Sequence, residues 1–169
     1  MGKIFLAVAA LTLGLAGMAL ASSQGDTYKL TARLKAGSEV PKPAGVPAAA
    51  TGLFTGKTVE LANNKARLTW KLTFSYLSGK AVAAHIHAGK AGKAGGVLVP
   101  LCGPCKNGQT GKAVITHAQE NRIEAGATYV NIHTAKNAAG EIRGQIKVPG
   151  GSSSTTPTPT PTPEPPPYP

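Results

Sequence analysis

The fold is decided by the stretch Ala66–Tyr76, which reads ARLTWKLTFSY. The even positions of this stretch are all apolar: Ala66, Leu68, Trp70, Leu72, Phe74 and Tyr76. The odd positions between them are all polar: Arg67, Thr69, Lys71, Thr73 and Ser75. Side chains that alternate with a period of two belong to a β-strand with one buried face and one face in water. The stretch therefore predicts a half-buried strand.

Further strands are expected on both sides of this one. Asn63 and Asn64 tolerate positive φ, so they predict a hairpin that pairs Phe54–Leu61 with the decisive strand. The other candidate strands are Tyr28–Leu34, Ala81–His87, Val97–Leu101, Ala113–Thr116, Thr128–Thr134 and Glu141–Val148. No stretch shows a helical period with caps. About seven to eight short strands favour an all-β fold, an antiparallel Greek-key-like sandwich or barrel.

The two ends of the 169-residue chain differ in composition from the rest. Met1–Ala21 reads as a signal peptide, because Lys3 precedes an apolar run and Ala19-Leu20-Ala21 is a small-x-small cleavage pattern. A retained anchor helix is the alternative, but the run is shorter than the ~20 residues that span a bilayer. Residues 151–169 are rich in Ser, Thr and Pro, which predicts a disordered, extended tail. We expect a secreted, periplasmic or cell-envelope protein that folds over residues 22–150 and has no integral membrane span after cleavage.

Charge and motifs restrict the function. The chain has 18 Lys and Arg against 7 Asp and Glu, a formal net charge of +11. Nucleic-acid binding is not expected, because neither interleaved aromatic residues nor a recognition element is present. Acidic envelope polymers, anionic lipid surfaces or another extracellular protein are the expected partners, and a merely solvated cationic surface is the alternative. The sequence has no nucleophile elbow, complete phosphate loop or evident carboxylate pair, and we assign no catalytic residue.

Three of the four histidines fall on polar faces of predicted strands. Taking Val82, Ala84 and Ile86 as the apolar set places His85 and His87 together on the other face. By the same reasoning Tyr129, Asn131 and His133 share a face. His85, His87 and His133 are thus candidate ligands for copper or zinc, provided that their strands are neighbours. Asn131, Glu141 and Arg143 are candidates for orienting these ligands, and Asn131 and Glu141 are also candidates for additional ligands. The alternative is that the histidines only hydrogen-bond to the backbone or to Glu141. His117 is interpreted as an ordinary surface residue.

Four ordered motifs resemble a CHRD domain, the module first described in chordin and found in many exported bacterial proteins. They are Leu34 with Gly37-Ser38-Glu39-Val40-Pro41, then Ala84-His85-Ile86-His87, then Ala125-Gly126 with Tyr129-Val130-Asn131-Ile132-His133-Thr134, and finally Gly140-Glu141-Ile142-Arg143-Gly144-Gln145-Ile146. The resemblance covers about Tyr28 to Val148 and implies an extracellular β-rich module without an established activity. A non-enzymatic binding or structural module is therefore expected.

Two further features keep alternatives open. His85-Ile86-His87 is similar to the copper strand of Cu/Zn superoxide dismutase, so a metal-dependent redox enzyme of that type is the alternative function. Cys102-Gly103-Pro104-Cys105 has the spacing of a redox-active pair, but it follows a predicted strand and precedes no predicted helix. In an exported protein we expect a structural disulfide between Cys102 and Cys105, with metal ligation and redox catalysis as the alternatives.

Overall fold

The structure is a computed structural model that describes residues 27–149, so the predicted signal peptide and tail lie outside the described residues. Its elements are β1 (Thr27–Lys35), the 3₁₀ turn η1 (Ala36–Ser38), β2 (Thr51–Leu61), β3 (Lys65–Ser75), β4 (Ala81–Ala88), β5 (Val97–Cys102), β6 (Gln109–Thr116), α1 (His117–Glu124), β7 (Thr128–Thr134) and β8 (Ile142–Gln145).

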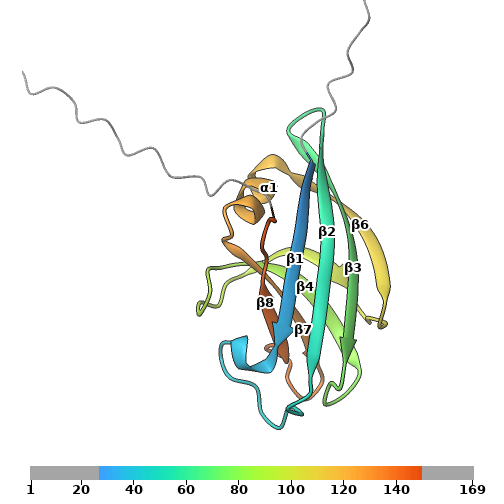
Figure 1. Cartoon of the computed structure of the whole chain (residues 1–169), viewed down its shortest axis with the longest axis vertical. Coiled ribbons are helices and arrows are strands. Elements are labelled where there is room, and N and C mark those ends of the chain that lie inside the picture. Colours follow the sequence, from blue (N-terminus) through green and yellow to red (C-terminus); the bar gives the residue numbers. More distant parts are fainter. Residues whose placement is uncertain (1–26, 150–169) are drawn as a thin grey trace, which may run out of the picture.

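The strands form one antiparallel sheet in the order β5-β4-β7-β8-β1-β2-β3-β6. The sheet curls into a nearly closed barrel, in which the edge strands β5 and β6 approach each other (Figure 1). Helix α1 lies at one end of the barrel and ties the two edges together, because it continues from β6 while Gln119 donates to the Leu98 carbonyl of β5 at 2.8 Å. The predicted all-β antiparallel class is confirmed.

The interior of the barrel is filled by the apolar residues that alternate along β1, β2 and β3. Leu34, Phe54, Leu68 and Leu72 are completely buried. Trp70 of β3 pairs with Gly111 of β6, where a Cβ atom would lie 2.3 Å from the indole ring. Only glycine leaves room for the indole ring at that position, so the burial of Trp70, the largest core side chain, depends on Gly111 of the neighbouring strand.

The decisive hairpin follows the sequence prediction with one correction. β2 and β3 are joined through Asn63 and Asn64, whose φ angles of 62° and 55° are both positive as predicted. The alternation predicts Tyr76 on the apolar face, but β3 ends at Ser75. Tyr76 has a φ of 58° and is 69% exposed, so the chain has already turned away from the sheet.

The expectation that the chain lacks a helix is wrong. Helix α1 begins at His117 after a capping box, in which the Thr116 side chain accepts from the Gln119 N–H and the Gln119 side chain accepts from the Thr116 N–H. The Thr116-x-x-Gln119 spacing is the sequence signal for this start. It was overlooked because only Glu120 and Ile123 of the short helix are buried, which leaves no visible apolar period.

A second correction concerns β4. Val82 was placed on the inward face, yet it is 43% exposed, while Ala84 and Ile86 are buried as expected. The pairing of β4 with β7 shifts register between Ala81 and Ala83. A bulge adds one residue to a strand and so shifts the phase of the alternation. Ala81 is therefore the inward residue before the shift, and Ala84 and Ile86 are the inward residues after it.

Candidate metal centre

Three histidines from two neighbouring strands converge on one side of the sheet, and we call His85, His87 and His133 the histidine face. β4 and β7 are direct neighbours, and the register pairs His85 with Asn131 and Ala83 with His133. His133 therefore lies diagonally beside His85, and His85 Nδ1 is 3.0 Å from His133 Nε2. One ring nitrogen from each of the three histidines lies within 4.8 Å of those of the other two.

Backbone carbonyls orient two of these rings. His87 Nδ1 is 2.9 Å from the Gly95 carbonyl, and His133 Nδ1 is 2.9 Å from the Ala138 carbonyl. A carbonyl only accepts, so in both rings Nδ1 carries the proton and Nε2 presents a lone pair. His87 Nε2 is buried and has no hydrogen-bond partner among the described residues. Two imidazoles are thus held in the tautomer that can bind a metal through Nε2.

The surroundings also favour neutral rings. Burial lowers the pKa of His85, and the neighbouring His133 and His87 lower it further. Burial likewise lowers the pKa of His133; the hydrogen bond to the Ala138 carbonyl opposes this effect and the proximity of His87 adds to it. Neutral imidazole is the form that ligates metals, so both shifts favour the metal-binding form of His85 and His133.

The polar face of the sheet that carries these histidines is covered rather than open to water. All seven residues of β7 are buried, and His87 and His133 are each only 8% exposed. Residues 89–96 cover part of the face. The Gly95 carbonyl accepts a hydrogen bond from His87 Nδ1, and the Gly95 N–H donates to the Tyr129 hydroxyl at 3.1 Å. Gly95 fits because a Cβ atom there would lie 1.7 Å from the Ala88 carbonyl oxygen.

The comparisons with known proteins identify the family. The model of the CHRD domain matches residues 30–146, a range that includes all three histidines. The chain belongs to the CHRD-domain family. Comparison with the curated proteins and with the solved structures finds no match.

Within this CHRD domain, Arg143 and Tyr129 support His87 by stacking. The Tyr129 and His87 rings are nearly parallel, with centroids 5.1 Å apart, and the Arg143 guanidinium carbon lies 3.3 Å above the Tyr129 centroid. Arg143 also donates to the Lys90 carbonyl at 3.0 Å. The stack fixes the plane of the His87 ring and holds residues 89–96 against the sheet.

Asn131 and Glu141, the other two residues expected to orient the ligands, have different surroundings. The Asn131 side chain hydrogen-bonds Glu39, so it joins the buried polar face without a described contact to a histidine. Glu141 contacts Ser78, Thr134 and Asn137 instead. Thr134 follows His133 in β7 and points to the opposite side, so Glu141 lies away from the three rings.

The two cysteines are joined as a disulfide, Cys102–Cys105. The bond joins the last residue of β5 to the loop that leads to β6, and the Cys105 N–H donates to the Ala81 carbonyl at 3.0 Å. The loop is thereby attached to the start of β4, and no helix begins at either cysteine. Among residues 27–149, no helix has the length and hydrophobicity needed to cross a bilayer.

Sequence reasoning missed two groups of residues. The contacts of Glu39 and Gly95 with the β7 face are not predicted, although Glu39 belongs to a family motif, because both residues come from loops far away in sequence. The sequence predicts an ordinary surface position for His117 and shows no evident carboxylate pair, yet Glu60 and Glu120 both approach His117. The capping box at Thr116 would have revealed the helix that brings His117 and Glu120 to one side.

Proposed function

We propose that the protein is an exported binding module of the cell envelope or extracellular space, which holds a copper or zinc ion on its histidine face. The single observation that carries the metal proposal is the orientation of the rings. Two buried imidazoles donate through Nδ1 to backbone carbonyls, so Nε2 of each carries a lone pair. His133 Nε2 lies 3.0 Å from His85 Nδ1, and His87 Nε2 lacks any described partner. A set of three imidazoles suits copper or zinc better than oxygen-preferring ions.

Export is supported by three features that agree with one another. Met1–Ala21 has the pattern of a signal peptide, the CHRD family occurs in exported proteins, and Cys102–Cys105 is a bond that persists in oxidising compartments. These features favour a secreted or envelope location.

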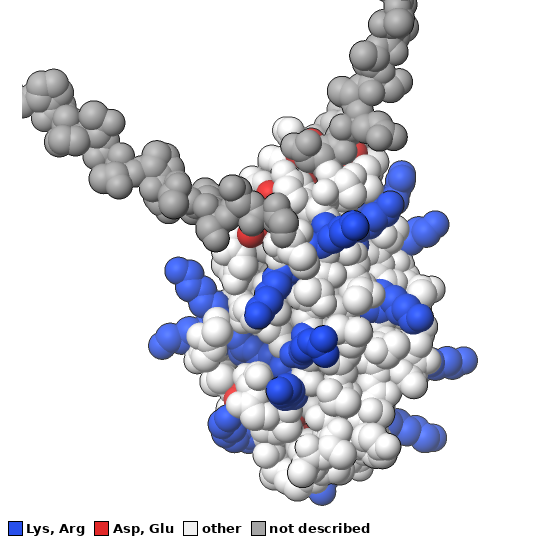
Figure 2. Space-filling view, in the orientation of Figure 1, with Lys and Arg blue, Asp and Glu red and all other residues white. Residues whose placement is uncertain are grey.

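The partner that we propose is an acidic envelope polymer, bound by what we call the cationic face. This face consists of the outward, exposed basic residues of β1, β2, β3 and β6, which are Lys29, Arg33, Lys35, Lys57, Lys65, Arg67, Lys71 and Lys112. The outward positions that alternate with the core along these strands include no Asp or Glu. Figure 2 shows lysine and arginine side chains spread over this side of the barrel.

The cationic face is also shaped for a ligand. Lys29 and Lys57 lie directly opposite each other on β1 and β2, an arrangement of like charges that destabilises a sheet. Four of the lysines line a shallow groove of about 500 Å³, together with threonines that offer hydroxyl groups. Repeated positive charge next to hydroxyl donors favours a carboxylated or phosphorylated polymer.

Metal analysis tests the first part of the proposal. Purified, tag-free protein is stripped with chelator, reloaded with Cu²⁺ or Zn²⁺, and analysed for bound metal, superoxide turnover and thermal stability. We expect the double variant His85→Ala/His87→Ala to lose one equivalent of metal. The control Lys71→Ala removes an exposed side chain outside the histidine face and should retain that equivalent.

The outcomes of this experiment distinguish a protein without the proposed metal site, a metal-binding module and a metal-dependent enzyme. Metal content that does not change in the double variant would remove the proposed site. An equivalent that depends on His85 and His87 without superoxide turnover supports the binding module. Turnover that disappears with the two histidines would favour the alternative enzyme of superoxide dismutase type.

A further inference from the structure

A second group of ligand-type side chains lies at the helix end of the barrel, away from β4 and β7. Glu60 near the end of β2, together with His117 and Glu120 of α1, forms what we call the helix-edge cluster. We propose that this cluster is a second divalent-metal site, of the zinc class, which shares no residue with the histidine face.

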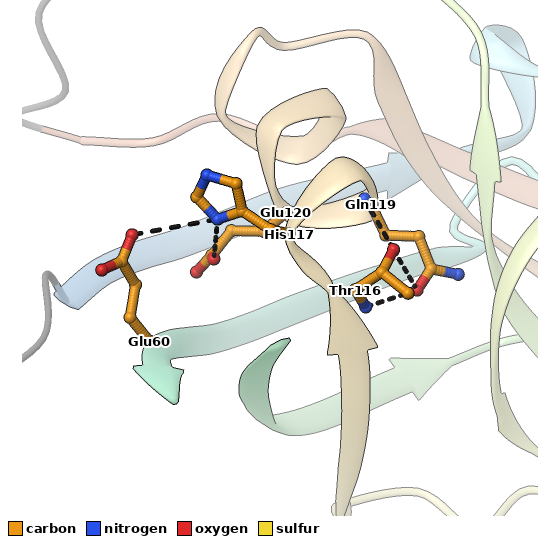
Figure 3. Close-up of polar contacts among 5 residues, drawn as sticks. All are labelled: Glu60, Thr116, His117, Gln119 and Glu120. Carbon is orange, nitrogen blue, oxygen red and sulfur yellow. Dashed lines mark hydrogen bonds and ion pairs between the residues drawn. The ribbon is translucent and has the colours of Figure 1, made fainter. Parts of the chain in front are cut away.

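The local fold brings these three residues together. The His117 N–H donates to the Asn64 carbonyl at 2.9 Å, which holds the first residue of α1 against the β2–β3 turn. Glu120 follows His117 by three residues, so both side chains point to the same side of the helix. Glu60 precedes the turn on β2, and its carboxylate reaches the same place (Figure 3).

The distances suit a shared ion. His117 Nδ1 is 3.5 Å from Glu120 Oε2 and 3.9 Å from Glu60 Oε1. All three ligand atoms lie within 4.8 Å of one another. Two ligands of a tetrahedral zinc ion, each about 2 Å from the metal, are roughly 3.3 Å apart. A small rotation of the exposed Glu60 side chain would therefore complete the arrangement.

The second, independent observation is that Glu120 is buried without a hydrogen-bond partner among the described residues. Its side chain is completely buried, and neither carboxylate oxygen has a hydrogen-bond partner among the described residues. A buried carboxylate normally has hydrogen bonds, a close cation or a metal. Glu120 does not serve as the helix cap either, because Thr116 and Gln119 already form the capping box.

An ion pair with protonated His117 is the competing explanation, and it satisfies the cluster less well. One imidazolium carries a single charge and faces two carboxylates, and neither of its contacts is a hydrogen bond. A divalent cation would balance both carboxylates and bond directly to the buried oxygen of Glu120. The donor set also selects the ion, because zinc binds both imidazole and carboxylate ligands, whereas Ca²⁺ and Mg²⁺ prefer oxygen ligands alone.

The cluster is open on one side. The side chains of His117 and Glu60 are 47% and 37% exposed, whereas Glu120 lies beneath them. An ion held there would keep a solvent-facing coordination position, which leaves room for a water molecule or a ligand group from a partner.

Zinc titration in a background without the histidine face tests this proposal. The chelator-stripped double variant His85→Ala/His87→Ala is titrated with Zn²⁺ by calorimetry, and its unfolding temperature is recorded with and without zinc. We expect one equivalent of zinc to remain and to raise the unfolding temperature. Adding His117→Ala should abolish both effects, and adding Glu60→Gln should weaken binding by at least about tenfold.

The control is Glu124→Gln, which removes a carboxylate from the same helix outside the cluster and should leave zinc binding unchanged. Glu120→Gln is a further test, but His117→Ala and Glu60→Gln change exposed side chains and decide the question even if that variant does not fold. The proposal is overturned if the double variant binds no zinc, or if its zinc binding is insensitive to His117→Ala. A simple ion pair would respond to His117→Ala without zinc and show no zinc-dependent shift.

Discussion

The outer faces of two regions of the barrel carry polar residues but have opposite environments. On β1, β2 and β3 the outward positions are mainly lysines, arginines and threonines, and most of them are exposed. On β7 the outward positions are Tyr129, Asn131 and His133, and all three are buried under loops. Strand alternation thus determines which side a residue occupies, whereas the loops determine whether that side meets water. Buried polar groups need fixed partners, so the covered region is where we expect large effects of substitution.

Glu141→Ala is the substitution for which we expect the largest loss of stability. Its carboxylate accepts from the Ser78 N–H at 2.5 Å, the Ser78 hydroxyl at 2.6 Å and Asn137 Nδ2 at 3.2 Å, and also from the Thr134 hydroxyl. Alanine would leave these donors without an acceptor, so the free energy of unfolding should fall by about 3 to 5 kcal/mol. Denaturant unfolding measures this change. Lys71→Ala on the exposed face is the control and should cost less than about 0.5 kcal/mol.

The pH dependence of this effect sharpens the test. Burial alone would raise the pKa of Glu141, but the hydrogen bonds from Ser78, Thr134 and Asn137 outweigh it and hold the pKa below the ordinary value of 4.5. The carboxylate therefore contributes stability above pH 4.5, which is lost as the pH falls below that value. A destabilisation by Glu141→Ala that stays constant down to pH 2 would contradict this account.

Glu39 should show the opposite pH dependence. Burial raises its pKa from 4.5 to about 7, although the charge of Arg143 and hydrogen bonds from Val40 and Asn131 oppose the increase. The protonated form is favoured in the folded state, so Glu39 makes folding less favourable as the pH rises from 4.5 through 7. We expect Glu39→Gln to gain stability relative to wild type over this range, by about 3 kcal/mol at most. Unfolding curves at several pH values measure the difference, and a pH-independent difference would refute the prediction.

The sequence allowed prediction of those parts of the fold that depend on alternation within one strand. The period of two in β3, the paired asparagines before it and the spacing of His85 and His87 all depend on neighbouring residues, and each is visible in the chain. Burial of the histidine face was not visible, because it depends on Gly95 and Ala138 from loops. The same reason explains the helix-edge cluster, in which Glu60 meets His117 only after β2, β3 and β6 have paired.

Gly95→Ala should have an intermediate effect that is confined to the covered region. The added Cβ would collide with the Ala88 carbonyl, so residues 89–96 must move away from the sheet. His87 and the Tyr129 hydroxyl would then lose their contacts with Gly95. We expect a cost of about 1 to 3 kcal/mol in the free energy of unfolding, with weaker metal binding at the histidine face. Gly92→Ala changes the same loop at a position where a Cβ atom has open space, although its φ of 76° adds backbone strain.

This pair of loop variants separates two causes of instability. Gly92→Ala should lower stability through backbone strain but leave metal affinity unchanged, because the contacts of Gly95 remain. Calorimetric titration with Cu²⁺ or Zn²⁺ measures the affinity of both variants. Equal losses of affinity would show that loop strain, rather than the orientation of His87, controls the site.

The exposed region should give the smallest change in stability and a distinct change in binding. In Lys57→Gln/Lys71→Gln, two charges disappear from the groove, and relief of the repulsion between Lys29 and Lys57 should offset the lost side-chain contacts. The free energy of unfolding should change by less than about 0.5 kcal/mol. Adsorption to polygalacturonate at low salt should nevertheless weaken, and its salt dependence should become shallower, because fewer charges contact the polymer. The control Lys93→Gln/Lys106→Gln removes the same charge from exposed residues outside the groove. Equal weakening by both double variants would show that net charge alone attracts the polymer. A larger effect of the groove variant assigns binding to the cationic face, provided that neutral dextran is not bound by any of the proteins.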